Sequence, residues 1–151
     1  LRVGWVVAAK PVISQMVLIK QAADLHTPSL NQIAVHDVAS RIFDSHVETV
    51  RSAYRQRRDA MLAALSEYMP EGVSWARPEG GMFVWLTLPT GLNGAELLAK
   101  SIETVGVAFV PGGAFYADEN GENTIRLSFS LSDADEINEG IRRLGMVLRG
   151  A

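Results

Sequence analysis

The chain has 151 residues, which suits one domain of ordinary size, and 48% of them are apolar, enough to build a core. Its net charge is −3 and its acidic and basic residues are interspersed, which argues against a nucleic-acid partner. No apolar run approaches the roughly 20 residues that span a bilayer, and the N-terminus lacks a secretory signal pattern, so we expect a cytoplasmic protein without a membrane partner.

The first half of the chain predicts one strand followed by helices. Residues 1–9, LRVGWVVAA, are β-branched and apolar enough for a buried strand, and a buried strand at the first residue suggests a chain cut from a longer one. Helical spacing of apolar residues follows over 12–25. The tract HTPSLNQ then interrupts the pattern, and Thr27 or Ser29 can cap a second helix. A separate long helix is predicted over about 44–69.

The second half reads as alternating strands and helices, which predicts a small α/β layer with its own core. In the last helix, Ser132 is the expected cap, with Asp133 and Asp135 in the first turn, where the helix dipole favours acidic side chains. The predicted strands are 73–76, 82–88, 107–110 and 124–130, and the predicted helices are 94–105 and the segment after Ser132.

Metal binding is not indicated. The chain has no cysteine, so it has neither disulfides nor thiolate ligands. Its histidines, His26, His36 and His46, are ten residues apart, and on a helix this spacing places neighbours roughly 80° apart around the axis. That arrangement does not form the common face that a zinc ion requires, and we expect no metal site.

A basic group, Arg51, Arg55, Arg57 and Arg58, interrupts the apolar stripe of the long helix. Such a group can bind an anion, or it can form the solvated face of a helix. Both interpretations remain open at the level of sequence.

The glycine pair Gly80–Gly81 precedes a very apolar strand in PEGGMFVWLTLP, residues 78–89. One interpretation is a plain turn between strands, since glycine adopts positive φ without steric cost. The other is a shape requirement near a site, where a side chain would obstruct the approach of a ligand or another segment.

Arg126 lies inside an otherwise apolar strand, TIRLSFS, and a buried unpaired guanidinium is costly. It can pair with an internal carboxylate, reach solvent at a strand end, or bind an anionic ligand. Strand alternation puts Ile125, Leu127 and Phe129 on one face and Arg126 on the other, so the guanidinium leaves the apolar layer. Its planar fork matches a carboxylate well.

Five strings in order resemble the C-terminal part of a class I pyridoxal-phosphate aminotransferase of fold type I. They are LRVGWVVA at the start, KQAADLHTPSLNQ at 20–32, RPEGGMFVW at 77–85, VAFVPGGAFY at 107–116 and ENTIRLSFS at 122–130. Within the class they most resemble the 2-aminoadipate aminotransferases of lysine biosynthesis, whose relatives include kynurenine aminotransferases. The resemblance implies an α/β chain, with 1–45 as the truncated end of the large cofactor domain and 46–151 as the connecting helix and small domain.

The resemblance also implies roles for two arginines. Arg2 matches the arginine that binds the phosphate of pyridoxal 5′-phosphate, and Arg126 matches the arginine that holds the substrate α-carboxylate. The Schiff-base lysine of the family would lie upstream of residue 1, and Lys10, Lys20 and Lys100 do not match its motif. We therefore expect amino-acid and 2-oxo-acid substrates and a homodimer for the intact enzyme, and no activity for these residues alone. The turn at 111–113 would deliver the next loop toward the pocket, and Ser29 and Asn31 receive no firm role.

Two other functions remain possible from sequence. Aminotransferase-like domains also serve as effector-sensing domains of transcription regulators, and an upstream winged-helix domain would favour that function. A plain structural module would bind neither phosphate nor dicarboxylates.

Overall fold

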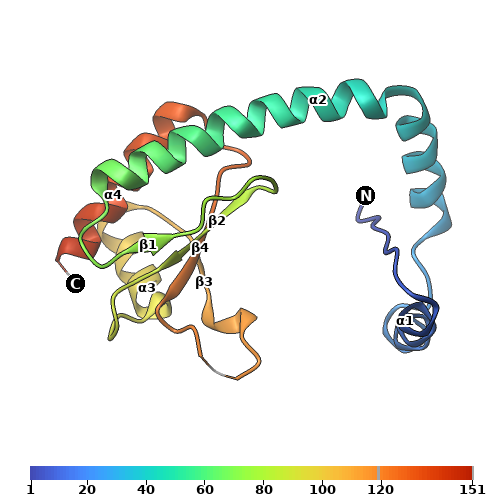
Figure 1. Cartoon of the computed structure of the whole chain (residues 1–151), viewed down its shortest axis with the longest axis horizontal. Coiled ribbons are helices and arrows are strands. Elements are labelled where there is room, and N and C mark those ends of the chain that lie inside the picture. Colours follow the sequence, from blue (N-terminus) through green and yellow to red (C-terminus); the bar gives the residue numbers. More distant parts are fainter. Residues whose placement is uncertain (119, 151) are drawn as a thin grey trace. The chain divides into compact units, whose positions relative to one another are not determined.

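The computed structural model describes residues 1–118 and 120–150 (Figure 1). They form two compact units, Leu1–Thr49 and Val50–Ala151, and the boundary between them lies within a helix. Among the described residues, none of the helices combines the length and hydropathy that a membrane crossing requires.

In the first unit, the strand predicted over residues 1–9 is wrong. These residues take no part in any described sheet, and Trp5 and Val7 are 76% and 92% exposed. The reason is that a strand requires a neighbouring strand for its backbone hydrogen bonds, and no described segment supplies one. Helix α1, Lys10–Ala23, follows directly, with a proline in its first turn and an ion pair of 2.8 Å between Lys20 and Asp24 at its end.

Helix α2, Ser29–Tyr68, is a single helix of 40 residues. The sequence predicted two helices here, with the second beginning near residue 44, and that division is wrong. No glycine or proline occurs between Ser29 and Tyr68, so nothing in the backbone ends the first helix. The helix is instead bounded by Pro28 and Pro70.

The second unit contains a four-stranded antiparallel sheet in the order β1-β2-β4-β3 (Figure 1). Strands β2 and β4 pair over their whole length, with Trp85 opposite Arg126. Of the third predicted strand, 107–110, only Val110 lies in a strand, and β3 continues to Pro111. The bounds are Ser74–Trp75 for β1, Phe83–Thr87 for β2, Val110–Pro111 for β3 and Thr124–Ser128 for β4.

Helices α3, Gly94–Val105, and α4, Ala134–Arg149, complete the second unit. Asp133, and not the expected Ser132, caps α4. Its carboxylate accepts hydrogen bonds from the backbone of Asp135 and Glu136, and the Glu136 side chain bonds back to the Asp133 N–H. This reciprocal box decides the cap, because only Asp133 has a glutamate three residues later.

One face of the sheet is covered by helices and forms the core. Alternate residues of β2 and β4, such as Leu86 and Ile125, pack with residues of α3, α4 and the second half of α2 in one apolar cluster. The intervening side chains, including Trp85 and Arg126, lie on the opposite face. The residues of interest for function are on that second face.

Candidate functional site

The predicted alternation along β4 is confirmed. Ile125, Leu127 and Phe129 are buried in the core, whereas Arg126 is half-buried on the other face of the sheet. Arg126 occupies an inner strand, between Trp85 of β2 and Val110 of β3 in the register. Its guanidinium therefore starts from the middle of the sheet and not from a strand end.

Aromatic rings surround this guanidinium. The guanidinium carbon lies 4.0 Å from the ring centroid of Phe83 and 4.9 Å from that of Phe115. Trp85 meets Phe115 edge to face at 5.6 Å and Tyr116 at 6.2 Å. The cluster thus combines one cation with four aromatic side chains on an uncovered sheet face, an arrangement that favours cation–π contacts.

Within the described residues, Arg126 forms no ion pair, and its Nε is buried without a hydrogen-bond partner. A buried donor left unsatisfied costs about 1–3 kcal/mol, so such groups require an explanation. No carboxylate of the described residues pairs with Arg126, and Arg126 is the third of the five residues of β4, so it does not lie at a strand end. Of the three sequence interpretations, an anionic ligand at the terminal nitrogens of Arg126 stays a prediction, and such a ligand would not account for the unpaired Nε.

A glycine brings Phe115 into this cluster. After β3 the chain turns through Gly112 into the short helix η1, Gly113–Phe115, and the Gly112 N–H donates to the Thr124 carbonyl at 2.7 Å. A Cβ on Gly112 would overlap Thr124 Oγ1 and lie 2.8 Å from Trp85 Cζ2. Only glycine therefore allows the turn to lie this close to β4.

Within this cluster only Arg126 was predicted from sequence as a binding residue, and its aromatic neighbours were not. Phe83 and Trp85 could have been found, because they alternate with the buried residues of β2 and must share the face of Arg126. Phe115 had no such signal, because a loop residue reaches the site only through tertiary structure.

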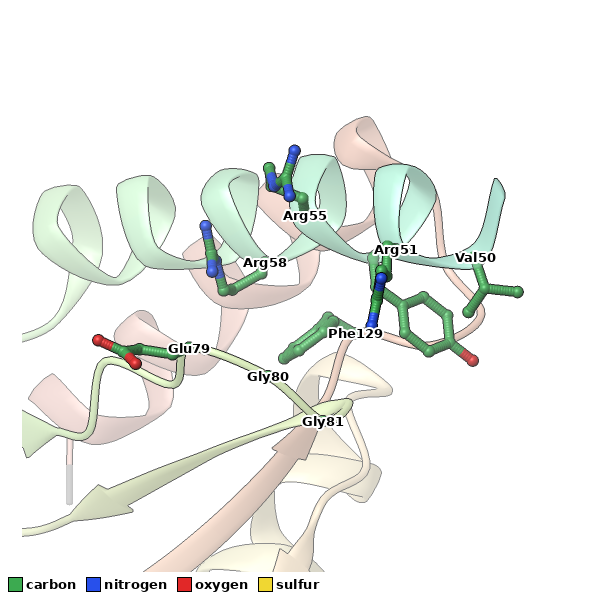
Figure 2. Close-up of a pocket in the computed structure, with 9 residues that line it drawn as sticks. Val50, Arg51, Arg55, Arg58, Glu79, Gly80, Gly81 and Phe129 are labelled. Atoms are coloured by element: carbon green, nitrogen blue, oxygen red, sulfur yellow. The ribbon is translucent and has the colours of Figure 1, made fainter. Parts of the chain in front are cut away.

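The glycine pair lines a separate cavity of about 400 Å³ between α2 and the turn before β2 (Figure 2). Gly81 has a φ of +77°, which glycine alone adopts without strain. No atom lies within 4 Å of a Cβ built at either glycine, so within this chain the conformation of Gly81, and not lack of space, requires the residue. The other lining residues are Val50, Arg51, Tyr54, Arg55, Arg58, Glu79 and Phe129.

The arginines of the predicted basic group have different contacts and do not form one common binding surface. Arg57 donates to the Ser130 carbonyl at 2.6 Å and links α2 to the end of β4. Arg58 pairs with Asp59 at 2.7 Å and donates to the Pro78 carbonyl at 3.3 Å. Figure 2 shows Arg51, Arg55 and Arg58 on α2, with Glu79 across the cavity from them. Neither sequence interpretation anticipated the structural contacts of Arg57 and Arg58.

Arg2 belongs to the first unit, whereas Arg126 belongs to the second. Arg2 is exposed and has a left-handed backbone with φ of 59°, which is uncommon for a residue with a side chain. The side-chain amide of Asn31 donates to the Leu1 carbonyl at 2.9 Å and holds this end of the chain to the start of α2. Residues held in rare conformations often occur at functional sites.

The three lysines occupy ordinary helical positions. Lys10 is the first residue of α1, and Lys20 forms the ion pair with Asp24. Lys100 of α3 donates to the Gly150 carbonyl at 2.8 Å.

Comparison with known proteins connects these features to one family. The family model described as aminotransferase class I and II matches residues 1–144. The 2-aminoadipate transaminase of Thermus thermophilus is 48% identical over 99% of this chain. The chain spans 38% of the length of that relative.

Solved structures agree with the sequence relatives. The crystal structure of LysN, the α-aminoadipate aminotransferase of Thermus thermophilus complexed with N-(5′-phosphopyridoxyl)-L-leucine, matches with a TM-score of 0.82. The match covers 95% of this chain and 37% of that one.

A transcription regulator is also similar in sequence. The "Uncharacterized HTH-type transcriptional regulator YdfD" of Bacillus subtilis is 34% identical over 99% of this chain and 30% of its own length.

Proposed function

Because the chain belongs to the aminotransferase class I and II family, we propose that it is the C-terminal part of an enzyme that moves an amino group between an amino acid and a 2-oxo acid. The term complete enzyme refers below to a protein that contains residues 1–151 and has the full length of these relatives. The observation that carries the proposal is the Arg126 guanidinium on the sheet face opposite the core, where it forms no ion pair among the described residues.

Arg126 binds the substrate α-carboxylate in this proposal. Its terminal nitrogens form a planar fork that fits both carboxylate oxygens, and a charge-assisted pair of this kind is stronger than a neutral hydrogen bond. Holding the carboxylate fixes the direction of the bonds at the substrate Cα, which is how binding geometry contributes to rate. The half-buried position of Arg126 strengthens the attraction, because nearby water is reduced.

The cofactor of the complete enzyme is pyridoxal 5′-phosphate. When bound, this group supplies the electron sink for breaking a bond at the substrate Cα. We assign its phosphate to Arg2, an assignment supported by the exposed side chain, the left-handed backbone and the tether from Asn31 to Leu1. None of the three lysines is assigned to the cofactor, because Lys10, Lys20 and Lys100 do not match the family's lysine motif.

The identity of 48% with a 2-aminoadipate transaminase supports 2-aminoadipate as an amino donor. We further propose that the complete enzyme is a cytoplasmic homodimer, that residues 1–45 complete its large domain, and that residues 46–151 form the connecting helix and small domain. The compact second unit from Val50 onward supports the last assignment.

Two assays test the proposal. The complete enzyme, loaded with pyridoxal 5′-phosphate, is expected to transfer the amino group of L-2-aminoadipate to a 2-oxo acid, detected as the new amino acid. Residues 1–151 alone are expected to be inert and to retain no pyridoxal phosphate on a lysine after borohydride reduction. Stoichiometric trapping on one lysine of residues 1–151 would contradict the lysine assignment.

A regulatory function is the second candidate, and the similarity to a transcriptional regulator over 99% of this chain favours it. In that case the gene would encode a DNA-binding domain upstream of Leu1, and the protein would bind the cofactor or an amino acid without turnover. Sequencing the gene upstream distinguishes the two functions directly.

A further inference from the structure

We propose that Phe83 and Phe115 form a two-ring clamp that fixes the Arg126 guanidinium in the orientation that binds a carboxylate. The inference rests on the proposed function of Arg126 and adds two positioning residues to it. The guanidinium carbon lies 4.0 Å from the Phe83 centroid and 4.9 Å from the Phe115 centroid, both within cation–π range.

The two rings reach Arg126 from opposite flanks of β4. Phe83 comes from β2, where it faces Ser128 in the register, and Phe115 comes from η1, beyond β3 on the other side. Phe115 is itself held edge to face against Trp85 at 5.6 Å. The guanidinium thus lies between rings whose own positions are fixed by the sheet and by the turn at Gly112.

Neither ring is placed there by core packing. Phe83 is 39% exposed and Phe115 is 53% exposed, whereas the core lies on the opposite face of the sheet. Phe83 contacts the Arg126 guanidinium, and Phe115 contacts both Arg126 and Trp85, which agrees with the attraction of an aromatic ring face for a cation.

The clamp also determines which edge of the guanidinium meets the ligand. Nε is buried and has no partner, so the edge that remains for a carboxylate is the pair of terminal nitrogens. An arginine side chain has many rotamers in water, and fixing it before binding lowers the entropy cost of complex formation. Phe83 and Phe115 therefore act on affinity through Arg126 and do not need to touch the reacting atoms.

Fluorination of Phe83 tests the clamp with little change of shape. Mono-, di- and trifluorinated phenylalanine at position 83 of the complete holoenzyme progressively weaken the negative ring face. As the probe we use L-leucine, whose phosphopyridoxyl adduct is bound in the similar LysN structure. We expect its Kd, followed by the absorbance change of the cofactor, to rise stepwise by roughly two- to thirtyfold in total. The Kd for isoamylamine, which has the same side chain without the carboxylate, should stay constant. Phe83→Tyr should retain the wild-type affinity.

A double-mutant cycle is the second test of the clamp. Phe83→Leu and Phe115→Leu should each weaken leucine binding, and the loss should disappear in an Arg126→Lys background, because both act through the same guanidinium. Tyr116→Leu is the matched control, since its ring lies against Trp85 and forms no cation–π contact with Arg126 among the described residues. It should change the Kd less than twofold.

Three results would overturn the clamp. They are a Kd that does not change with fluorination, a loss from Phe83→Leu that persists undiminished with Arg126→Lys, or an equal loss from Tyr116→Leu. Failure of the underlying function looks different, because then Arg126→Lys itself would leave the ratio of leucine to isoamylamine affinity unchanged.

Discussion

Gly112 and Thr124 are packed backbone to backbone, with the Gly112 N–H 2.7 Å from the Thr124 carbonyl oxygen and no room for a Cβ beside Thr124 Oγ1. Gly112→Ala should therefore force the turn away from β4, although its φ of −81° would suit alanine. Overpacking of this kind costs about 1–3 kcal/mol, and Phe115 should move with the turn.

The neighbouring Gly113 provides the control for that prediction. A Cβ there would come no closer than 4.0 Å to Glu122 Cα, an ordinary contact. Urea unfolding of both alanine variants, together with the KM of the complete enzyme for the proposed donor L-2-aminoadipate, measures the difference. Equal stability and equal KM for the two variants would contradict the steric account.

Arg126→Lys keeps the charge but loses the planar fork. We expect the complete enzyme to lose about 1.5–3 kcal/mol of transition-state stabilisation with L-2-aminoadipate. This loss corresponds to a fall in kcat/KM of roughly ten- to more than a hundredfold. The melting temperature should change little, because Arg126 forms no ion pair with the described residues and its ring contacts are with two partly exposed side chains. Steady-state kinetics and thermal unfolding check the two parts, and an unfolding defect without a kinetic one would assign Arg126 to structure.

The close approach of α4 to the end of α2 depends on Gly145. A Cβ on this buried residue would overlap the Tyr68 carbonyl oxygen and lie 3.1 Å from its carbon. Gly145→Ala should destabilise the protein by about 1–3 kcal/mol. In the same helix, Gly140 has no atom within 4 Å of a built Cβ, so Gly140→Ala should stabilise by about 0.5–1 kcal/mol through helix propensity. In urea unfolding, we expect the free energy of unfolding to fall for Gly145→Ala and to rise for Gly140→Ala.

The start of α4 should depend on Asp133 and not on Ser132. Asp133→Ala removes the acceptor for two backbone N–H groups and should cost about 1 kcal/mol in thermal or urea unfolding. Ser132→Ala should stay within about 0.5 kcal/mol of the wild type. A larger loss from the serine variant would mean that the cap lies one residue earlier.

Glu139 should make stability depend on acid pH. Hydrogen bonds from Arg142 and then Arg143 lower the pKa of Glu139 from 4.5 to about 2. Because the folded-state pKa is depressed, the stabilisation is complete above pH 4.5 and is lost as the pH falls through about 2. Glu139→Gln should therefore melt below the wild type at neutral pH, with a gap that closes toward pH 2.

The effect of Glu139 should be small, because its side chain is 43% exposed. Glu103→Gln is the matched control, an exposed carboxylate on α3 without an ion pair among the described residues. Melting curves from pH 7 to pH 2 that keep a constant gap for Glu139→Gln would contradict the prediction.

Several features were predictable because they depend on neighbours in sequence. Helix 94–105 has the predicted ends, since Asn93 caps its first N–H groups and Gly106 ends it with a φ of +69°. The alternation that turns Arg126 away from the core follows from the period of a strand. The family resemblance is confirmed by the match over residues 1–144, and the expected α/β fold by the TM-score of 0.82.

Other features depended on residues far apart in the sequence. Whether residues 1–9 become a strand depends on a partner strand, and no described segment supplies one. Phe115 meets Arg126 only because Gly112 lets a loop lie against β4. Sequence thus determined the residue types and their periodic faces, since those follow from local backbone geometry. Tertiary structure alone decided which rings surround the guanidinium, because contacts between distant segments depend on how the whole sheet and its turns pack.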